Sequence, residues 1–374
     1  MDDDDLLREI LLRLPALPSS LPHASLVCKR WRCLVSDPGF IRRFRTHHGK
    51  PPLLGLFRFL RPDLGITDLR RLCFTPTLDP PDHIPAARFS PDRRRGERCS
   101  FHGYRHGLAL ILNHTRQEAI VWNPDTGDQR CVSFPPAVVS RQRESFRDET
   151  LHGTILGNDN SQLSPFKLVL VWYAGGHQAP YACLYQSESG LWGNVVSTSA
   201  YAPWTPWTAS SVMVGNALCW LLCGGHILEF DVETQTLAVI KKPVGLFSDS
   251  NFQILRTEDN EHGLALVSGL TDIQLWERKA NFNGIVGWVL QKTIELDKLL
   301  SVKPSVLNVG ARILAFAEDA NAIVVWLQDD GVFLIQLESL QFKKISEITG
   351  ASPWYPYASF FTADRGIGGG ANGV

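Results

Sequence analysis

The sequence predicts an α+β multi-domain chain, with a small N-terminal three-helix module followed by an all-β propeller of about six blades. The first 48 residues carry apolar side chains at helical spacing, whereas the later residues form short apolar runs separated by Gly, Pro, Asp and Asn. One strand-and-turn pattern also recurs along the second part. We place the module at 1–48, the β-domain at 49–364 and a Gly-rich tail, which we expect to be disordered, at 365–374.

Three helices account for the first part. Asp5 is a favourable N-cap residue for the first helix, and Pro15 ends that helix. A second helix is expected over 24–35, and the segment 36–38, Ser-Asp-Pro, is a start signal for a third. Because a core of this size is marginal by itself, we expect a partner surface to complete it.

The second part changes from helical spacing to short strands. The expected strands are 53–59, 107–112, 119–122, 167–173, 217–223, 227–231, 323–327 and 332–337. Many short strands predict a sandwich, a barrel or a propeller.

An internal repeat favours the propeller. A large apolar residue ends a strand and is followed three and four residues later by an acid and a hydroxyl, at Trp122, Tyr185, Phe230 and Ile335, with a degenerate copy at Trp276. The spacing fits blades of about 40–50 residues plus loops. We expect these anchors to be buried and the acid and hydroxyl to stabilise the turn. Strands near 53–59 and 69–74 should join the last strand, 357–362, in a sixth blade that closes the ring.

Charge and cysteine content exclude several classes of protein. The 37 Lys and Arg nearly balance the 38 Asp and Glu, so no general attraction to nucleic acid or to an anionic membrane is expected. No apolar run reaches the roughly 20 residues that span a bilayer. Four Asp near the start are unlike a signal peptide, and the eight Cys form no C-x-x-C pair. We expect a reduced protein of the cytoplasm, the nucleus or both.

Catalytic and metal-binding motifs are lacking. The sequence holds no G-x-S-x-G, H-E-x-x-H or P-loop motif. Cys99, His102 and His106 have ligand-like spacing, but no second pair of ligands accompanies them. We therefore expect no catalytic residues, no cofactor and no metal site.

The N-terminal residues closely resemble the F-box. The matching segments are D-L-L-R-E-I-L-L-R-L-P at 5–15 and S-L-V-C-K-R-W-R-C-L-V-S-D-P-G-F at 25–40. Trp122-Asn-Pro-Asp-Thr-Gly127 resembles the WNP-x-TG signature of plant F-box-associated domains, and weaker similarity to grass-type members occurs at 107–110, 275–278 and 355–361. Two positions depart from the family pattern: Asp2-Asp3 replaces its opening Leu-Pro, and Pro22-His23 replaces a frequent Leu-Arg.

The resemblance implies a non-catalytic substrate-recognition adaptor of an SCF-type cullin–RING ubiquitin ligase. The F-box would bind a Skp-type adaptor, and the β-domain would bind a protein substrate that the sequence does not identify. Carried over by position, the adaptor-binding residues are Leu6, Leu7, Ile10, Leu11, Leu14, Pro15, Leu21, Val27, Cys28 and Trp31. Some of these ten must pack inside the module instead, and the sequence does not divide them. Two alternatives stay open: an F-box scaffold or regulator that acts without ubiquitin transfer, and an enzyme, which convergent polar side chains in the central channel would support.

Overall fold

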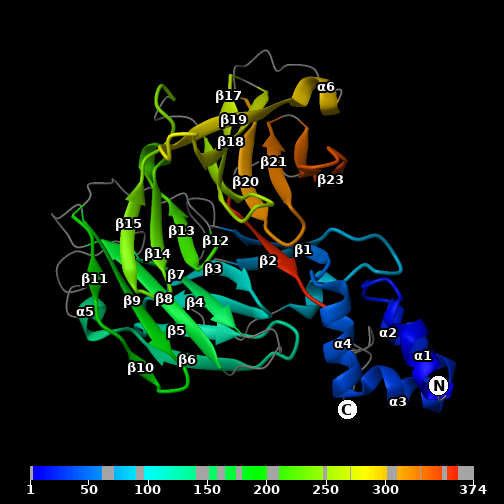
Figure 1. The fold of residues 1–374 in the computed structure, drawn as a ribbon. Helices are drawn as coiled ribbons and strands as arrows, with labels where there is room; N and C mark the ends of the chain where they lie inside the picture. Colours follow the sequence, from blue (N-terminus) through cyan, green and yellow to red (C-terminus); the bar gives the residue numbers. More distant parts are fainter. Residues whose placement is uncertain are drawn as a thin grey trace.

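The chain forms a helical lobe beside a ring of β-sheets (Figure 1). The computed structural model describes residues 3–60, 71–89, 97–139, 151–157, 165–173, 179–199, 210–246, 251–269, 271–300, 310–328, 330–347 and 352–360. The tail 365–374, expected to be disordered, lies outside the described residues. Within the described ranges, no helix has the length and apolar character needed to span a membrane.

The helical module, residues 3–48, has four helices where three were expected. They are α1 (Asp3–Leu12), α2 (Ser20–Val27), α3 (Lys29–Ser36) and α4 (Pro38–His48). The expected second helix is interrupted because Cys28 has an extended backbone, with φ −162° and ψ 171°. The third start signal is confirmed: the Asp37 side chain accepts a hydrogen bond from the Phe40 N–H at 2.7 Å, and Pro38 is the first helical residue.

The described strands form six sheets, which we number as blades around the ring. Blade 1 contains β1 (Leu53–Leu60), β2 (Arg71–Pro76) and β24 (Trp354–Ala358). Blade 2 contains β3 (Cys99–Arg105), β4 (Leu108–Asn113), β5 (Glu118–Trp122) and β6 (Gln129–Ser133). Blade 3 contains β7 (Leu151–Gly157), β8 (Phe166–Tyr173), β9 (Pro180–Gln186), β10 (Leu191–Trp192) and β11 (Val196–Ser197).

Blades 4 to 6 each have four strands in sequence order. Blade 4 contains β12 (Val212–Val214), β13 (Ala217–Leu221), β14 (Ile227–Asp231) and β15 (Thr236–Ile240). Blade 5 contains β16 (Phe252–Arg256), β17 (His262–Ser268), β18 (Asp272–Ala280) and β19 (Val286–Glu295). Blade 6 contains β20 (Arg312–Ala317), β21 (Ala322–Leu327), β22 (Gly331–Gln336) and β23 (Phe342–Ser346). Short helices α5 (Pro136–Val139) and α6 (Leu296–Leu300) lie between blades in the sequence, and the described residues include the 3₁₀ turns η1 (Ala86–Arg88) and η4 (Cys223–Gly225).

The first and last strands of the β-domain close the ring, as predicted. Strand β1 pairs antiparallel with both β2 and β24, with Phe57 opposite Phe74 on one side and Tyr355 on the other. The parts of the expected strands at 69–70 and 361–362 lie outside the described residues. The first strands of blades 2 to 6 and strand β24 line the centre, and a hydrogen bond of 2.9 Å from the Ser211 hydroxyl to Thr154 connects blades 3 and 4.

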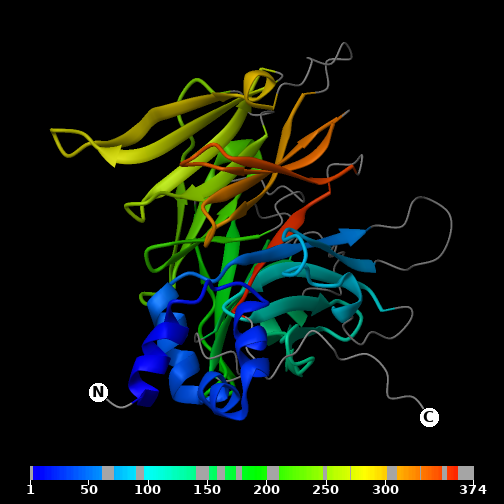
Figure 2. The ribbon, with the colours of Figure 1, turned by 90° about the vertical axis from the view of Figure 1, so that its right-hand side faces the viewer.

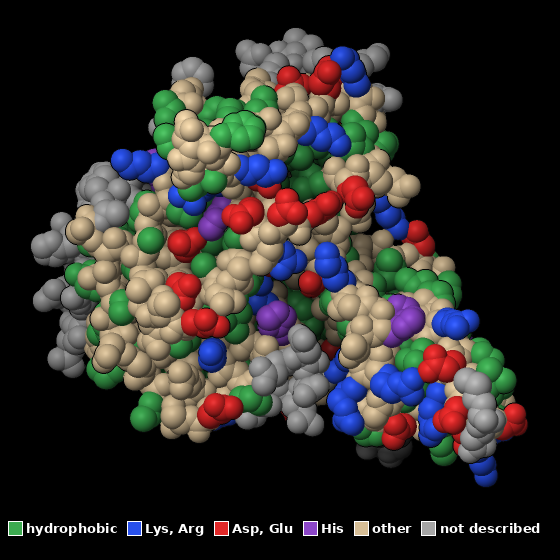
Figure 3. Space-filling view, viewed as in Figure 1, with side chains coloured by type: hydrophobic (Ala, Val, Ile, Leu, Met, Phe, Trp, Pro, Cys, Tyr) green, Lys and Arg blue, Asp and Glu red, His purple; other side chains and the backbone are tan. Residues whose placement is uncertain are grey.

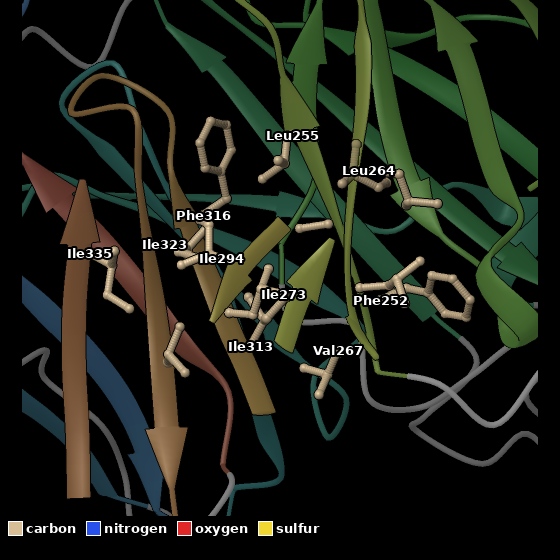
Figure 4. Close-up of a cluster of buried hydrophobic side chains, with 14 of the residues drawn as sticks. Phe252, Leu255, Leu264, Val267, Ile273, Ile294, Ile313, Phe316, Ile323 and Ile335 are labelled. Carbon is tan, nitrogen blue, oxygen red and sulfur yellow. The ribbon is translucent and has the colours of Figure 1, made fainter. Parts of the chain in front are cut away.

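The core of the propeller lies between the blades. Figure 4 shows apolar side chains of blades 5 and 6 packed together, among them Phe252, Ile273 and Ile323. Four of the five repeat anchors are buried as expected: Trp122, Tyr185, Phe230 and Ile335. The expectation for Trp276 is wrong in degree, because its ring is only partly buried while Ile273 on the same strand is fully buried. A register shift between Leu275 and Trp276 accompanies this difference.

The hydroxyl expected to stabilise the turns does so after three anchors: Thr126, Ser189 and Ser339 each accept a backbone hydrogen bond of 3.3 Å, from the N–H groups of Asp128, Leu191 and Gln341. Two turns also use a residue that was not expected. After Trp122, the Asn123 side chain accepts hydrogen bonds from the N–H groups of Asp125 and Thr126, at 2.9 and 3.3 Å. After Phe230, Asp231 does the same for Glu233 and Thr234. The residue directly after the anchor therefore stabilises these two turns through its short side-chain carbonyl or carboxylate.

Candidate functional site

The helical module has a core of its own. Eight apolar residues are buried in it: Leu11, Leu12, Leu21, Ala24, Leu34, Val35, Phe40 and Phe44. Helical spacing explains this core, since Leu11 and Leu12 face inward from α1 while Phe40 and Phe44 lie one turn apart on α4. The module can therefore hold a defined surface for a partner.

Four large apolar side chains of this module are left exposed. Leu6 and Ile10 of α1 are each 52% exposed, and Leu26 and Val27 at the end of α2 are 72% and 61% exposed. Leu6 and Ile10 are four residues apart and so lie on one face of α1. We call these four residues the apolar face of the module. Exposed apolar groups of this kind mark partner surfaces when they are gathered on a small folded unit.

The ten residues that the resemblance assigned to adaptor binding divide into three groups. The exposed ones are Leu6, Ile10, Pro15, Val27 and Cys28. Those partly buried against the module core are Leu7, Leu14 and Trp31. Leu11 and Leu21 pack inside the module, since their side chains are 0% and 1% exposed. These two leucines support the surface from beneath.

Leu26 is the exposed residue that the sequence reasoning left out. It lies at the end of α2 and has the largest exposed fraction on the apolar face. Helix geometry gave a signal for it, because at 3.6 residues per turn Leu26 lies about 140° around the helix from the buried Leu21. An apolar residue so far from the buried side of a short helix does not pack in the core of the module.

Ion pairs connect α1 to α3 and to α4. Arg30 connects the start of α3 to the start of α1, with its Nε 2.6 Å from Asp4 Oδ1 and its Nη1 3.7 Å from Asp3 Oδ2. Asp3, which stands where the family pattern has proline, thus forms an ion pair here. Arg43 of α4 similarly reaches Glu9 of α1 at 2.7 Å. Figure 3 shows the module as a separate lobe with basic and acidic side chains intermixed.

The module is docked on the propeller at the end of strand β24. Phe360 follows β24 and packs against the module core, with its ring 6.4 Å from that of Phe44 in an edge-on arrangement. The Ser19 N–H donates a hydrogen bond of 2.8 Å to Asp82 Oδ1 in the segment after β2. A cavity of about 490 Å³ lies at this junction, between α4 and the loops near His106 and Asp319. Figure 2 shows the module at one end of the molecule and the long β18–β19 hairpin, in yellow, at the other.

The Trp-Asn-Pro-Asp-Thr-Gly segment holds the closing strand in place. Trp122 is buried beside Phe57 of blade 1, with ring centroids 6.1 Å apart. Asp125 accepts hydrogen bonds from the hydroxyls of Tyr357 and Ser359, the latter at 3.0 Å. Because burial and the nearby Asp125 raise the pKa of Tyr357, this phenol stays protonated and donates. The motif therefore connects blade 2 to the strand that closes the ring.

The central channel contains a polar network that joins four blades. Glu318, which follows β20, pairs with Arg105 of β3 and accepts a hydrogen bond of 3.2 Å from the Met213 N–H of β12. Arg105 also donates to the Ser211 carbonyl at 3.0 Å, and Arg256 of β16 donates to the Glu318 carbonyl at 3.4 Å. The Glu318 carboxylate is thus bound by Arg105 and by the Met213 N–H, and we interpret it as part of a structural ion pair.

The cysteine and histidines with ligand-like spacing are not brought together. Cys99 is buried in the wall of blade 2. The Ser100 hydroxyl lies 2.7 Å from Nε2 of both His102 and His114, and the His102 ring is edge-on to that of His152 at 5.2 Å. Nδ1 of His106 is 3.0 Å from the Gly157 carbonyl. His106 is exposed, whereas His102, His114 and His152 form a buried cluster in which burial lowers the pKa of His102 well below its usual value.

Comparison with known proteins gives the same division of the chain. Residues 3–43 match the F-box domain, and residues 102–357 match a family described as "F-box protein AT5G49610-like, beta-propeller". The F-box/LRR-repeat/kelch-repeat protein At2g27520 of Arabidopsis thaliana is 23% identical over 334 residues, covering 87% of this chain and 84% of that protein. The F-box/kelch-repeat protein At3g17530 of the same plant is 25% identical over 167 residues, 44% of this chain and only 39% of that relative's length. The chain belongs to the family of F-box proteins with an AT5G49610-like β-propeller.

Proposed function

We propose that this chain is the substrate-recognition subunit of an SCF-type cullin–RING ubiquitin ligase. The F-box binds a Skp-type adaptor, and the propeller binds a protein substrate. The observation that carries the proposal is the apolar face of the module, because a small folded unit with its own core leaves Leu6, Ile10, Leu26 and Val27 exposed. Each large apolar side chain that a partner fully buries contributes about 1.5–3 kcal/mol.

The described chemistry supports a binding role in place of a catalytic one. F-box proteins are generally non-catalytic adaptors. In the channel, where an enzyme would need free acid or base groups, the Glu318 carboxylate is held by Arg105 and a backbone N–H. On this proposal the chain raises the effective concentration of the substrate beside the charged ubiquitin carrier and sets its orientation. The reaction needs no cofactor from this subunit.

The compartment belongs to the same proposal. The cysteines in the described ranges are free thiols, which fits a reducing environment. We place the complex in the cytoplasm, the nucleus or both, with proteins as partners and with no role for nucleic acid or membrane. Fractionation of cells that express the tagged full chain tests this placement.

Reconstitution of the ligase tests the function. The full chain is captured with its bound proteins under proteasome inhibition, and each captured protein is then offered to a complex of this chain, the Skp-type adaptor, the cullin–RING core and charged ubiquitin carrier. We expect ubiquitin transfer to at least one captured protein, and loss of that transfer when the chain is omitted.

The scaffold or regulator alternative gives a different result in the same assay. It requires binding to the Skp-type adaptor without transfer of ubiquitin to any captured protein. A complex that forms with full affinity and leaves every captured protein unmodified would favour this alternative over the ligase.

A further inference from the structure

Three side chains of metal-binding type meet between blades 4 and 5. Cys219 of β13 and Glu229 of β14 are direct cross-strand partners, so their side chains leave the sheet on the same face. His262, the first residue of β17, approaches them from blade 5. His262 Nε2 lies 2.6 Å from Glu229 Oε2 and 3.6 Å from Cys219 Sγ. The three ligand atoms are all within 4.8 Å of one another.

A single hydrogen bond on His262 Nε2 can satisfy Glu229 or the Cys219 thiol, but not both. An imidazole nitrogen carries either one proton or one lone pair. If His262 Nε2 is protonated, it donates to Glu229 and has no lone pair for the Cys219 thiol; if it is not, it faces the carboxylate without a proton between them. In the described part of the chain, the ion pairs of Glu229 are limited to the one with His262. A cation between the three atoms would be a partner for all of them.

We propose that Cys219, Glu229 and His262 bind one Zn²⁺ ion, which connects blade 4 to blade 5. Sulfur, imidazole nitrogen and carboxylate oxygen are the donors that zinc takes, at about 2.3, 2.0–2.1 and 2.0–2.2 Å. Tetrahedral geometry at these lengths separates the ligand atoms by about 3.3–3.6 Å. The observed sulfur-to-nitrogen distance of 3.6 Å already fits. The nitrogen-to-oxygen distance must open by about 0.7 Å, which rotation of the Glu229 side chain can supply.

The fourth ligand is a water molecule, since three protein donors are present. The thiol loses its proton to solvent when the metal–sulfur bond forms, so one proton is released for each ion bound. No electron is transferred, because zinc has no redox chemistry in proteins. The ion would strengthen a contact that also contains a hydrogen bond of 3.2 Å from the Gly215 N–H to Asn260 Oδ1.

Metal titration of the purified full chain tests the site. The protein is treated with a chelator and titrated with Co²⁺, which replaces zinc and gives a thiolate-to-metal absorption band. We expect one equivalent of Co²⁺ with this band, its displacement by Zn²⁺, and a rise in Tm on addition of Zn²⁺. Cys219→Ser should abolish the band, and Glu229→Gln and His262→Gln should each weaken binding at least tenfold.

A matched cysteine supplies the control. Cys183 of β9 is also buried, and its thiol donates to the Gly193 carbonyl at 3.2 Å, so Cys183→Ser should keep both the band and the Tm shift. If Cys219→Ser does not fold, His262→Gln and Glu229→Gln decide the question. The proposal is overturned if the wild-type chain binds less than one equivalent, if a folded Cys219→Ser variant keeps the band, or if Glu229→Gln and His262→Gln both bind Co²⁺ as tightly as the wild type. It is also overturned if the band is lost only when the exposed Cys28, Cys33 and Cys131 are replaced.

Discussion

The helical module and the propeller differ in how completely they bury their apolar side chains. In the propeller, each blade buries its apolar side chains against the next, and β1 and β24 close the ring so that the core is completed within the chain. The module buries eight apolar residues and still exposes Leu6, Ile10, Leu26 and Val27. In the described part of the propeller, exposed large apolar side chains gather on the β18–β19 hairpin around Phe282, at the end far from the module (Figure 2), and others lie at Leu191, Val195, Val244 and Phe342. The difference indicates that ring closure completes the propeller core within the chain, whereas the small module leaves apolar side chains that a partner can cover.

Removal of a large buried anchor from the propeller should lower the free energy of unfolding more than the other changes proposed below. Trp122→Ala leaves a cavity beside Phe57 at the junction of blades 1 and 2, and should lower the free energy of unfolding by about 3–5 kcal/mol. Trp276→Ala is the matched comparison, because the Trp276 ring is only partly buried and its loss should cost clearly less. Urea unfolding followed by tryptophan fluorescence and circular dichroism measures both. Equal losses in the two variants would remove the distinction between these anchors.

Leu11 and Leu26 distinguish a leucine that stabilises the module core from one that is available to a partner. Leu11→Ala truncates a fully buried side chain and should destabilise the module by about 2–5 kcal/mol. Leu26→Ala changes an exposed side chain and should alter the free energy of unfolding by no more than about 0.5 kcal/mol. Proteolysis within residues 3–48 as a function of urea reports on the module separately from the propeller. A Leu26→Ala variant as unstable as Leu11→Ala would show that the apolar face is part of the core.

The hydrogen bond that holds the closing strand should have an intermediate effect. Tyr357→Phe removes the hydroxyl that donates to Asp125 and keeps the ring in its packing. Hydrogen bonds to charged groups contribute about 1.5–3 kcal/mol, so the free energy of unfolding should fall by about that amount and the unfolding midpoint should fall with it. Ser359→Ala removes the second, more accessible donor to the same carboxylate and should cost less. An unchanged midpoint for Tyr357→Phe would mean that the motif does not secure the ring.

The buried histidine cluster should give the propeller a dependence on pH. Burial and the neighbouring His152 and His114 lower the pKa of His102 below the value of about 6.5 expected in the unfolded chain. Above about pH 6.5, His102 is neutral in both the folded and the unfolded chain, and it does not reduce the stability of the propeller. As the pH falls below 6.5, the unfolded chain binds a proton that the folded chain does not, so the free energy of unfolding decreases.

Unfolding midpoints between pH 7.5 and pH 5 measure this decrease. His102→Gln should reduce the slope because it removes the titrating group while leaving a polar side chain near Ser100. His106→Gln is the matched control, since His106 is exposed and bonded to the Gly157 carbonyl. A slope unchanged by His102→Gln would contradict the assignment.

Much of the architecture could be predicted because the propeller repeats one local pattern. Trp122 and Phe230 were found from the strand-and-turn repeat, and closure by strands near 53 and 357 followed from the need to pair both ends. Burial of Trp276 was overestimated because the register shift beside it depends on the pairing with β19 and leaves no local signal. The break at Cys28 was missed for a similar reason, since neither proline nor glycine marks it.

The residues of the two candidate sites also differ in whether local sequence spacing or tertiary packing determines them. Leu6 and Ile10 were identifiable from helical spacing, whereas burial of Leu11 and Leu21 depends on how α1 and α2 pack together. Cys219, Glu229 and His262 are separated by 10 and 33 residues, and only the packing of blade 5 on blade 4 brings them together. The expectation of no metal site rested on the spacing of ligands along the sequence. That spacing gives no signal for the proposed site, whose residues come from two blades.

The affinity of the full chain for a Skp-type adaptor tests the central claim most directly. Isothermal titration should give a one-to-one complex with the wild-type chain. The double variant Ile10→Ala with Leu26→Ala should bind about 2–4 kcal/mol more weakly, which is about 30- to 700-fold in Kd, while its thermal unfolding stays like that of the wild type. Phe282→Ala, a change at a still more exposed apolar side chain on the distant hairpin, should bind normally. Wild-type affinity in the folded double variant, or no binding of any Skp-type adaptor by the wild-type chain, would contradict the account.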